Sequence, residues 1–411
     1  MRKAINDFSI PFEPQQDSIT RLLNEIGNAQ YVLLGESSHG TSEFYSIRSE
    51  ITKRLIEEKG FTVVGIEGDW PSSQAVNEYV KEKNPHYCKA KEALSEFKRW
   101  PSWMWANEEM ISLIEWMREK NLEKHFHERT GFYGLDVYSL WESLEKIYDY
   151  IEKTGRGDVE ALRKVFECFD PFQQDNEKYA ISAAVQHESC LHEVTNLLVD
   201  VKKNYENKLN LSEENFGAMI NALVVSHAEK YYRSMVFHNH ESWNIRDRHM
   251  VEALNTIMKF HGSTAKAVIW EHNTHVGDAR ATDMKKDGMV NVGQLLREQE
   301  SPENVYIVGF GTYSGTVIAS ESWGNNYEVM NVPNAQSGSW EELLHQEGAA
   351  DKMILFSSEN ADKFSNEIGH RAIGVVYHPE YEAHGNYVPS IMSARYDAFI
   401  FLNETTHLHP F

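Results

Sequence analysis

Two short motifs that combine an acid with histidine are the parts of this sequence best suited to chemistry. In the first, Glu36 and His39 follow an apolar run; in the second, His272 and His275 follow another, with Glu271 just before them. A histidine oriented by a carboxylate can take a proton from water, because an unperturbed imidazole titrates near physiological pH. We therefore expect a hydrolytic site that activates water directly.

Further charged side chains could complete such a site. A third apolar run ends in Glu67 and Asp69, so more carboxylates stand at the end of a predicted strand. Attack of water on a carbonyl group creates an oxyanion, which needs a cation or a hydrogen-bond donor close by. Arg48, in the segment after the first motif, and Arg246 are candidates for that cation.

A serine nucleophile fits this sequence less well. The strained turn of a G-x-S-x-G elbow needs its second glycine, and His39 stands in that place after Gly35 and Ser37. The glycines of GFGTYSG, residues 309–315, differ from a dinucleotide fingerprint, since the third comes one residue late and a strand is expected to follow. We expect those glycines at a hairpin turn.

A metal centre stays open as an alternative. The side chains that would bind zinc or another divalent cation are Glu36, His39, Glu67, His272 and His275. The HNTH segment, however, follows a predicted strand and is not an HExxH motif on a helix. We prefer direct activation of water, with no metal and no cofactor.

The spacing of apolar residues predicts the elements that position these side chains. Strands are predicted at 31–34, 61–66, 131–135, 265–270, 305–310, 315–319, 353–356, 372–377 and 398–402. Helices are predicted at 14–27, 41–59, 72–80, 107–120, 140–151, 159–169, 180–198, 216–235 and 245–258. Chemistry in α/β sheets is usually placed at the carboxyl ends of strands, so we expect the motifs to converge on one cleft.

These elements predict an α/β fold, with a mixed or parallel sheet flanked by helices and interrupted by a large helical insertion. Residues 1–138 and 262–411 would form the discontinuous α/β core, and residues 139–261 the helical lobe. The 411 residues, 41% of them hydrophobic, are enough for such a core.

The composition argues against two classes of partner. The formal net charge of −22, without a block of Lys and Arg, disfavours binding to nucleic acid or to an anionic membrane. No apolar run approaches the roughly 18 residues of a membrane span. We expect a small-molecule substrate; the sequence leaves the oligomeric state open.

Cysteine usage and the amino terminus predict a cytoplasmic protein. The three cysteines, Cys88, Cys168 and Cys190, have no CxxC spacing, which argues against a disulfide framework or a zinc ribbon and fits a reducing compartment. The first residues, MRKAINDFSIPFEP, lack the apolar stretch of a signal peptide.

Aromatic residues gather in the segment FKRWPSWMW, residues 97–105. Trp103 and Trp105 could form a packed corner around Pro101, or an apolar wall or lid over a substrate pocket. Trp70, which follows Asp69, could contribute to the same pocket.

Four segments together resemble the erythromycin esterase family, which includes members named for succinoglycan biosynthesis. They are GESSHGTSEFYSIRSEITKRLIEEKGFTVVGIEGDW (35–70), NIRDRHM (244–250), WEHNTH (270–275) and GFGTYSGT (309–316). The resemblance covers essentially the whole chain in the expected order. It implies a metal-independent hydrolase that attacks a lactone ester with activated water.

The resemblance also implies residue roles. His39 corresponds to the base and Glu36 to its carboxylate partner, with Arg48 as the arginine of the following helix. Glu67 corresponds to the acid at the end of the second strand. The two histidines of the WEHNTH segment are His272 and His275, of which His272 is slightly favoured, and the Arg-Asp pair is Arg246 with Asp247.

We therefore expect a hydrolase that cleaves a small carboxylic ester or lactone. His39 activates water, Glu36 orients His39, Glu67 positions water, and Arg48, His272 or His275 stabilises the oxyanion. The groups expected to contact substrate are Asp69, Trp70, Trp103, Trp105 and Arg246.

Other interpretations stay open. The same cleft could belong to a metal-dependent hydrolase, or to a non-catalytic protein that binds a saccharide or another small ligand in a polysaccharide pathway. Glu67 and Arg48 could instead form a buried structural ion pair. His227 and His238, which precede NIRDRHM, could face the cleft.

Overall fold

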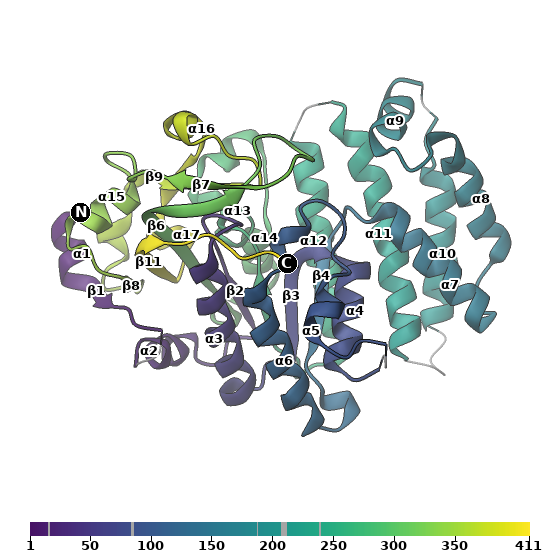
Figure 1. Ribbon diagram of the computed structural model, residues 1–411, viewed down its shortest axis with the longest axis horizontal. Helices are drawn as coiled ribbons and strands as arrows, with labels where there is room; N and C mark the ends of the chain where they lie inside the picture. Colours follow the sequence, from purple (N-terminus) through teal and green to yellow (C-terminus); the bar gives the residue numbers. More distant parts are fainter. Residues whose placement is uncertain (15–16, 84–85, 187, 207–211, 238–239) are drawn as a thin grey trace. The chain divides into compact units, whose positions relative to one another are not determined.

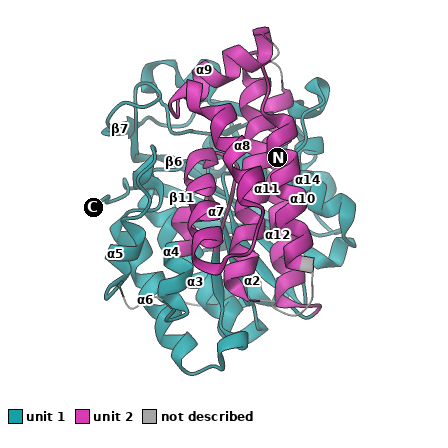
Figure 2. Ribbon diagram, turned by 90° about the vertical axis from the view of Figure 1, so that its right-hand side faces the viewer, with its two compact units in different colours: residues 1–66, 75–132, 264–411 teal, residues 67–74, 133–263 magenta. Residues whose placement is uncertain are grey.

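The chain forms two compact units in the computed structural model (Figure 2), which describes residues 1–14, 17–83, 86–186, 188–206, 212–237 and 240–411. Unit 1 comprises residues 1–66, 75–132 and 264–411, and unit 2 comprises residues 67–74 and 133–263. The helical lobe was predicted at 139–261; unit 2 begins at Tyr133 and also includes the segment that contains Glu67 and Asp69.

A mixed β-sheet forms the centre of unit 1 (Figure 1). Among the described residues it has nine strands: β1 (Ser9–Pro11), β2 (Tyr31–Leu34), β3 (Val63–Asp69), β4 (Gly131–Asp136), β5 (Ala267–Trp270), β6 (Val305–Ala319), β7 (Glu328–Val332), β8 (Lys352–Leu355) and β11 (Ala398–Thr405). Their order is β1-β8-β11-β6-β2-β5-β3-β4, with β7 paired to β6. The last residues of β3 and β4 belong to unit 2. A separate pair consists of β9 (Glu367–Arg371) and β10 (Tyr387–Ile391). The predicted α/β fold class is confirmed.

The register of the parallel strands brings the two sequence motifs to one edge of the sheet. Leu34, at the end of β2, pairs with Trp270 on β5 and with Val308 on β6. Ile66 on β3 pairs with Trp270 from the other side. β2 and β5 therefore end side by side at the same edge of the sheet. Glu36 follows the end of β2, and His272 follows the end of β5.

Helices of unit 1 cover this sheet. They are α1 (Arg2–Phe8), α2 (Asp17–Ile26), α3 (Ser42–Lys59), α5 (Ala90–Leu94), α6 (Glu108–Leu122), α13 (Asn273–Val276), α14 (Val292–Gln299), α15 (Trp340–Gln346), α16 (Glu382–Gly385) and α17 (Met392–Arg395). The long α3, which packs beside α6, buries Phe44, Tyr45, Ile51 and Leu55 in the main core. The first turn of α3 is therefore anchored in the core, three residues after His39.

Unit 2 is mainly helical. Its helices are α7 (Leu140–Thr154), α8 (Val159–Phe169), α9 (Asn176–Ile181), α10 (Leu191–Glu206), α11 (Glu213–Met235) and α12 (Glu241–His261). Their apolar faces form one core that includes Leu144, Val165, Val194 and Val225. α11 packs against α7, α10 and α12, which makes it the central helix of the unit.

Cys168 and Cys190 form a disulfide within unit 2, and the remaining Cys88 is an exposed thiol. The cysteine spacing argued against a disulfide framework, and this one bridge corrects that expectation. No cysteine spacing predicted this bridge, because α8, which carries Cys168, and the start of α10, directly after Cys190, bring the two cysteines together only in the folded unit.

The hairpin predicted at the glycines of residues 309–315 is also wrong. β6 continues through them as one strand because it pairs with β11 along this length, from Val308 with Ala398 to Gly315 with Thr405. Gly315 has a φ of +146°, and a Cβ there would lie 1.9 Å from the carbonyl oxygen of Thr405, so only glycine fits.

Several other predicted elements differ from the structure, three of them as follows. The strand expected at 372–377 is absent there, and β9 lies just before it at 367–371. The helix expected over 180–198 is divided between α9, a π-helical turn at Ser182–Gln186, and α10. The helix expected from residue 72 is α4 (Trp70–Val80), which begins two residues earlier.

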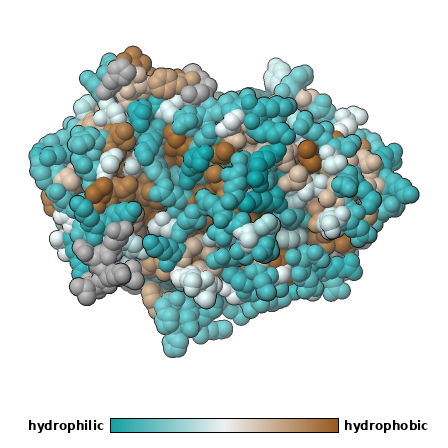
Figure 3. Space-filling model, turned by 180° about the vertical axis from the view of Figure 1, so that it is seen from behind, coloured by the Kyte–Doolittle hydropathy of each residue, from teal (hydrophilic) through white to brown (hydrophobic). Residues whose placement is uncertain are grey.

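One face of the molecule, shown in Figure 3, is largely hydrophilic, with apolar residues scattered among polar ones. In the described part of the chain, no helix is both long enough and apolar enough to cross a membrane.

Candidate functional site

Glu36 and His39 form a hydrogen-bonded pair in the turn between β2 and α3. The Nδ1 atom of His39 lies 2.9 Å from Oε1 of Glu36, and both residues are buried. A carboxylate only accepts hydrogen bonds, so Nδ1–H of His39 donates to it. This contact fixes the tautomer of His39 and leaves Nε2 as the basic nitrogen.

Arg48 holds the other oxygen of Glu36. Its Nη2 donates to Oε2 of Glu36 at 2.5 Å, and its Nε donates to the carbonyl of Phe44 at 3.2 Å. The guanidinium lies 4.6 Å from the ring centroids of both Tyr45 and Trp270 and is fully buried. Its position suits the orientation of Glu36 better than the oxyanion contact expected from the sequence. Within unit 1 the partner of Arg48 is Glu36, and within unit 2 Glu67 pairs with Arg246.

His272 is the histidine of the second motif that lies against His39. Their ring centroids are 4.9 Å apart, with the planes inclined by 40°. His272 is the N-cap of α13, and its Nδ1 accepts the backbone N–H of Thr274 at 3.3 Å. A nitrogen that accepts carries no proton, so the proton of neutral His272 is on Nε2. His275 is buried one turn further along α13.

Asn273, which sequence reasoning passed over inside the WEHNTH segment, connects the two motifs. Its backbone N–H donates to the carbonyl of Glu36 at 2.8 Å. Gly35 allows this approach, since a Cβ on that residue would lie 2.1 Å from Oδ1 of Asn273. The first and second motifs are therefore joined at backbone level.

A second charged group lies within unit 2. Arg246 donates from Nη2 to Oε1 of Glu67 at 2.7 Å and to Oδ2 of Asp136 at 2.7 Å, and from Nε to Oδ1 of Asp136 at 2.9 Å. Burial alone would raise the pKa of Asp136, but the guanidinium of Arg246 outweighs it and lowers that pKa. Burial would likewise lower the pKa of Arg246, and the two carboxylates raise it instead. Asp136 was not among the predicted site residues, although it ends a predicted strand.

The aromatic residues expected to contact substrate are packed inside their units. In unit 2, Trp70 is 3% exposed and stacks on Tyr133 at a centroid distance of 5.7 Å. Asp69, beside it, is also buried.

In unit 1, Trp103 and Trp105 are each 3% exposed, and the ring of Trp105 lies 5.8 Å from that of Tyr45 and 6.5 Å from that of Phe97. This arrangement corresponds to the packed corner, which was the other interpretation of the segment.

Two further histidines of unit 2 contact each other. Nδ1 of His227 lies 2.9 Å from Nδ1 of His249. Burial is the main cause that lowers the pKa of His227 to about 3 and that of His249 to about 4. His238, considered with His227 in the sequence, lies outside the described residues.

Glu36, one of the five side chains considered as metal ligands, has both carboxylate oxygens in hydrogen bonds. One oxygen accepts from His39 and the other from the guanidinium of Arg48. Over the described ranges, no three side chains of His, Cys, Asp or Glu are grouped as metal ligands.

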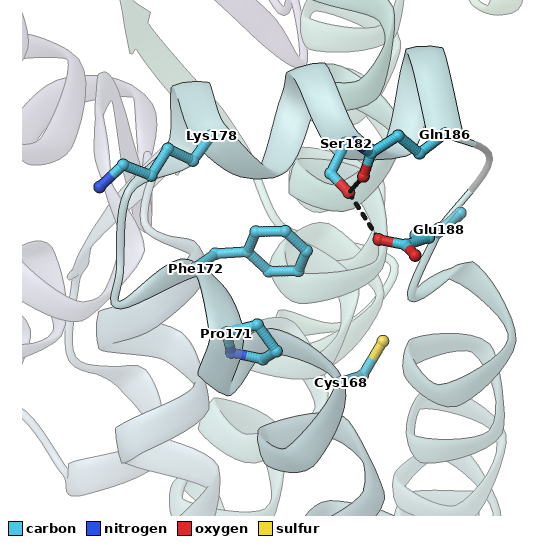
Figure 4. Close-up of a pocket in the computed structure, with 8 residues that line it drawn as sticks. Cys168, Pro171, Phe172, Lys178, Ser182, Gln186 and Glu188 are labelled. Atoms are coloured by element: carbon cyan, nitrogen blue, oxygen red, sulfur yellow. Dashed lines mark hydrogen bonds between the residues drawn. The ribbon is translucent and has the colours of Figure 1, made fainter.

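A cavity of about 580 Å³ in unit 2 contains none of the predicted site residues. Figure 4 shows Ser182 with its hydroxyl oxygen 3.0 Å from Oε1 of Gln186 and 2.9 Å from Oε2 of Glu188. The residues that line it are Cys168, Pro171, Phe172, Lys178, Ser182, Gln186, Glu188 and Ser189.

Residues 56–405 match the family described as erythromycin esterase. The chain belongs to this family. The match begins after the turn that carries Glu36 and His39, and it includes Glu67, Arg246 and His272. Membership supports an esterase-like hydrolase that acts on a small molecule.

The similarity of this erythromycin esterase family member to known proteins covers most of the chain. Erythromycin esterase type II of Escherichia coli is 22% identical over an alignment of 390 positions, which covers 86% of this chain and 88% of that protein. A crystal structure of a succinoglycan biosynthesis protein has a TM-score of 0.79 at 21% identity, covering 99% of this chain and 97% of that one. A mutant of the erythromycin esterase EreC in its open conformation has a TM-score of 0.67 at 16% identity, covering 96% of each chain. At these identities the two structures show a shared fold.

Proposed function

We propose that this protein hydrolyses a carboxylic ester or lactone of a small molecule, with water activated by His39. The observation that carries the proposal is the contact of 2.9 Å between His39 Nδ1 and Glu36. It fixes the imidazole in the tautomer whose Nε2 can accept a proton, which is the requirement for a general base.

The steps follow from these positions. His39 Nε2 takes a proton from water while the water oxygen bonds to the carbonyl carbon. The carbonyl oxygen becomes an oxyanion, which the Nε2–H of His272 stabilises. Collapse of this intermediate breaks the bond to the alkoxy oxygen, and His39 returns its proton to that oxygen. The products are an acid and an alcohol, joined in one molecule if the substrate is a lactone.

Arg48 has a supporting role in this proposal. Its guanidinium fixes the Glu36 carboxylate from the side away from His39, so that the carboxylate can orient only the imidazole. This replaces the direct oxyanion role expected from the sequence.

We propose that no metal takes part. A cation bound by the Glu36 carboxylate would have to compete with the Arg48 guanidinium and with the N–H of His39, which already hold its two oxygens. Elemental analysis of protein purified without added metal tests this point, followed by turnover after dialysis against a chelator. Stoichiometric zinc or manganese that is needed for turnover would overturn it.

A panel of macrolides, aryl esters and acylated sugars tests the function, with turnover and ligand-induced melting shifts read in parallel. For a responsive ester, His39→Asn should lower kcat by about 10²- to 10⁴-fold, the usual contribution of a general base, with an unchanged melting temperature. Retained turnover in that variant contradicts the proposal. Melting shifts without turnover across the panel would support the non-catalytic binding protein instead.

A further inference from the structure

Three buried polar side chains of unit 1 form a hydrogen-bonded row that begins at Asn273 in the second motif. Nδ2 of Asn273 lies 3.1 Å from Nε2 of His370, and Nδ1 of His370 lies 2.5 Å from Oε1 of Glu341. All three residues have no exposed surface. His370 and Glu341 are 97 and 68 positions away from Asn273 in the chain, so no sequence motif contains the group.

The direction of every hydrogen bond in this row is determined. Asn273 Nδ2 lies 2.6 Å from the carbonyl oxygen of Phe310, and its Oδ1 faces the N–H of the same residue at 3.3 Å. Only the NH₂ group can donate to a carbonyl, so the amide cannot be flipped. Its second proton then points at His370 Nε2, which must accept. The proton of His370 is therefore on Nδ1 and is donated to Glu341.

The surroundings keep His370 in that state. Burial lowers the pKa of His370, and although Glu341 opposes this effect, the charges of Arg395 and Arg371 reinforce it. The imidazole is therefore neutral at pH 7. An imidazolium would turn an N–H toward the N–H of Asn273, which breaks this row.

Asn273 has no alternative position. Arg395 donates from Nη2 to its carbonyl oxygen at 3.0 Å, and its own N–H donates to the carbonyl of Glu36 at 2.8 Å. A Cβ on Gly35 would lie 2.1 Å from Oδ1 of Asn273, so the amide packs directly against this glycine. Losing the acceptor at His370 would leave one buried N–H of Asn273 without that partner, and the cost of this unmade bond favours a shift of Asn273 and of the turn that carries His272.

We propose that His370, held by Glu341, is a positioning residue that fixes Asn273 and thereby sets His272 against the Glu36–His39 pair. The consequence for catalysis rests on the proposed function, whereas the geometric coupling does not.

Two matched variants separate positioning from packing. The side-chain oxygen of Gln reaches the place of His Nε2, so His370→Gln keeps an acceptor for Asn273. The amide of Asn reaches only the place of Nδ1, so His370→Asn keeps the donor to Glu341 and loses that acceptor. For a responsive ester, kcat should fall about 10- to 100-fold in His370→Asn, with little change in KM, and much less in His370→Gln, because small misplacements of reacting groups have effects of this size. Equal losses of kcat in the two variants would overturn the proposal.

A readout independent of activity keeps the inference testable if no ester in the panel is turned over. ¹⁵N-histidine NMR at pH 7 should show His370 neutral, with its proton on Nδ1. The His272 signals should change in His370→Asn and stay unchanged in His370→Gln; identical His272 signals in both would contradict the coupling. If His370→Asn does not fold, the spectrum of the parent protein still decides. An imidazolium at pH 7, or a neutral His370 with its proton on Nε2, would overturn the inference.

Discussion

Nδ1 of His39 lies 2.9 Å from Oε1 of Glu36, three residues earlier in the chain. The pair lies in a turn between a strand and a helix, where each end of the segment is fixed by the core.

Replacing Glu36 with Gln should remove the fixed orientation of His39. The glutamine amide can present N–H to Nδ1, which favours the opposite tautomer and moves the proton onto Nε2, where the base must be unprotonated. Turnover of a responsive ester should fall by about 10²- to 10⁴-fold. The measurement is kcat against pH, and a wild-type profile in Glu36→Gln would show that Glu36 does not orient the base.

Removing the Arg48 guanidinium should destabilise unit 1. Arg48→Met leaves the carboxylate of Glu36 buried without its cation, which typically costs about 3–5 kcal/mol. Arg54, six residues later on α3, pairs with Glu58 at the surface and offers a matched control, because Arg54→Met should cost less than about 1 kcal/mol. Denaturant unfolding of both variants gives the comparison, and equal costs would contradict the structural role of the buried pair.

A methyl group at Gly35 should disturb the contact between the two motifs. The Cβ of Gly35→Ala would lie 2.1 Å from Oδ1 of Asn273, so the turn must shift. We expect a loss of about 1–3 kcal/mol in stability, as for other overpacked sites, together with a lower kcat. Gly385→Ala is the control, since no atom lies within 4 Å of its Cβ. The prediction fails if the two alanine variants melt and turn over alike.

Acid should destabilise unit 2 through His227 and His249. The unfolded chain binds protons at these histidines below about pH 6.5. The folded chain binds them only near pH 3 for His227 and pH 4 for His249. Since the unfolded state holds more protons in this window, the free energy of unfolding falls as pH falls from about 6.5.

The variant His249→Asn removes one of these titrating groups. Between pH 7 and pH 5 it should lose about 2 kcal/mol less of its unfolding free energy than the parent protein does. His192→Asn, at an exposed position of the same unit, is the control. Parallel stability curves for the parent and His249→Asn would show that burial of this imidazole is not linked to pH.

Much of the fold could be predicted from the sequence because its signals are local. The apolar runs at 31–34, 131–135 and 398–402 correspond to β2, β4 and β11, and the 3.6-residue periods of the insertion correspond to its long helices. The failures occur where partners distant in the chain decide the structure. β6 passes straight through its glycines because β11 pairs with it, and β11 lies about 90 positions later.

The candidate site divides in the same way. Glu36, His39 and His272 could be named because acid and histidine follow apolar runs directly. Sequence reasoning could not place Arg48 on Glu36, because the fold decides which carboxylate a buried arginine meets. His370 and Glu341 carried no signal, since neither directly follows a strand that the sequence predicted.

The buried Glu36–Arg48 pair also bears on the balance between folding stability and catalytic activity in this protein. Both ions lose their hydration when the chain folds, so the environment of the base is already dry and oriented before a substrate arrives. Two apolar side chains of similar volume in these positions would be neutral or even favourable for folding. Replacing both residues with apolar side chains should therefore raise the thermal stability of the protein and abolish its catalytic activity.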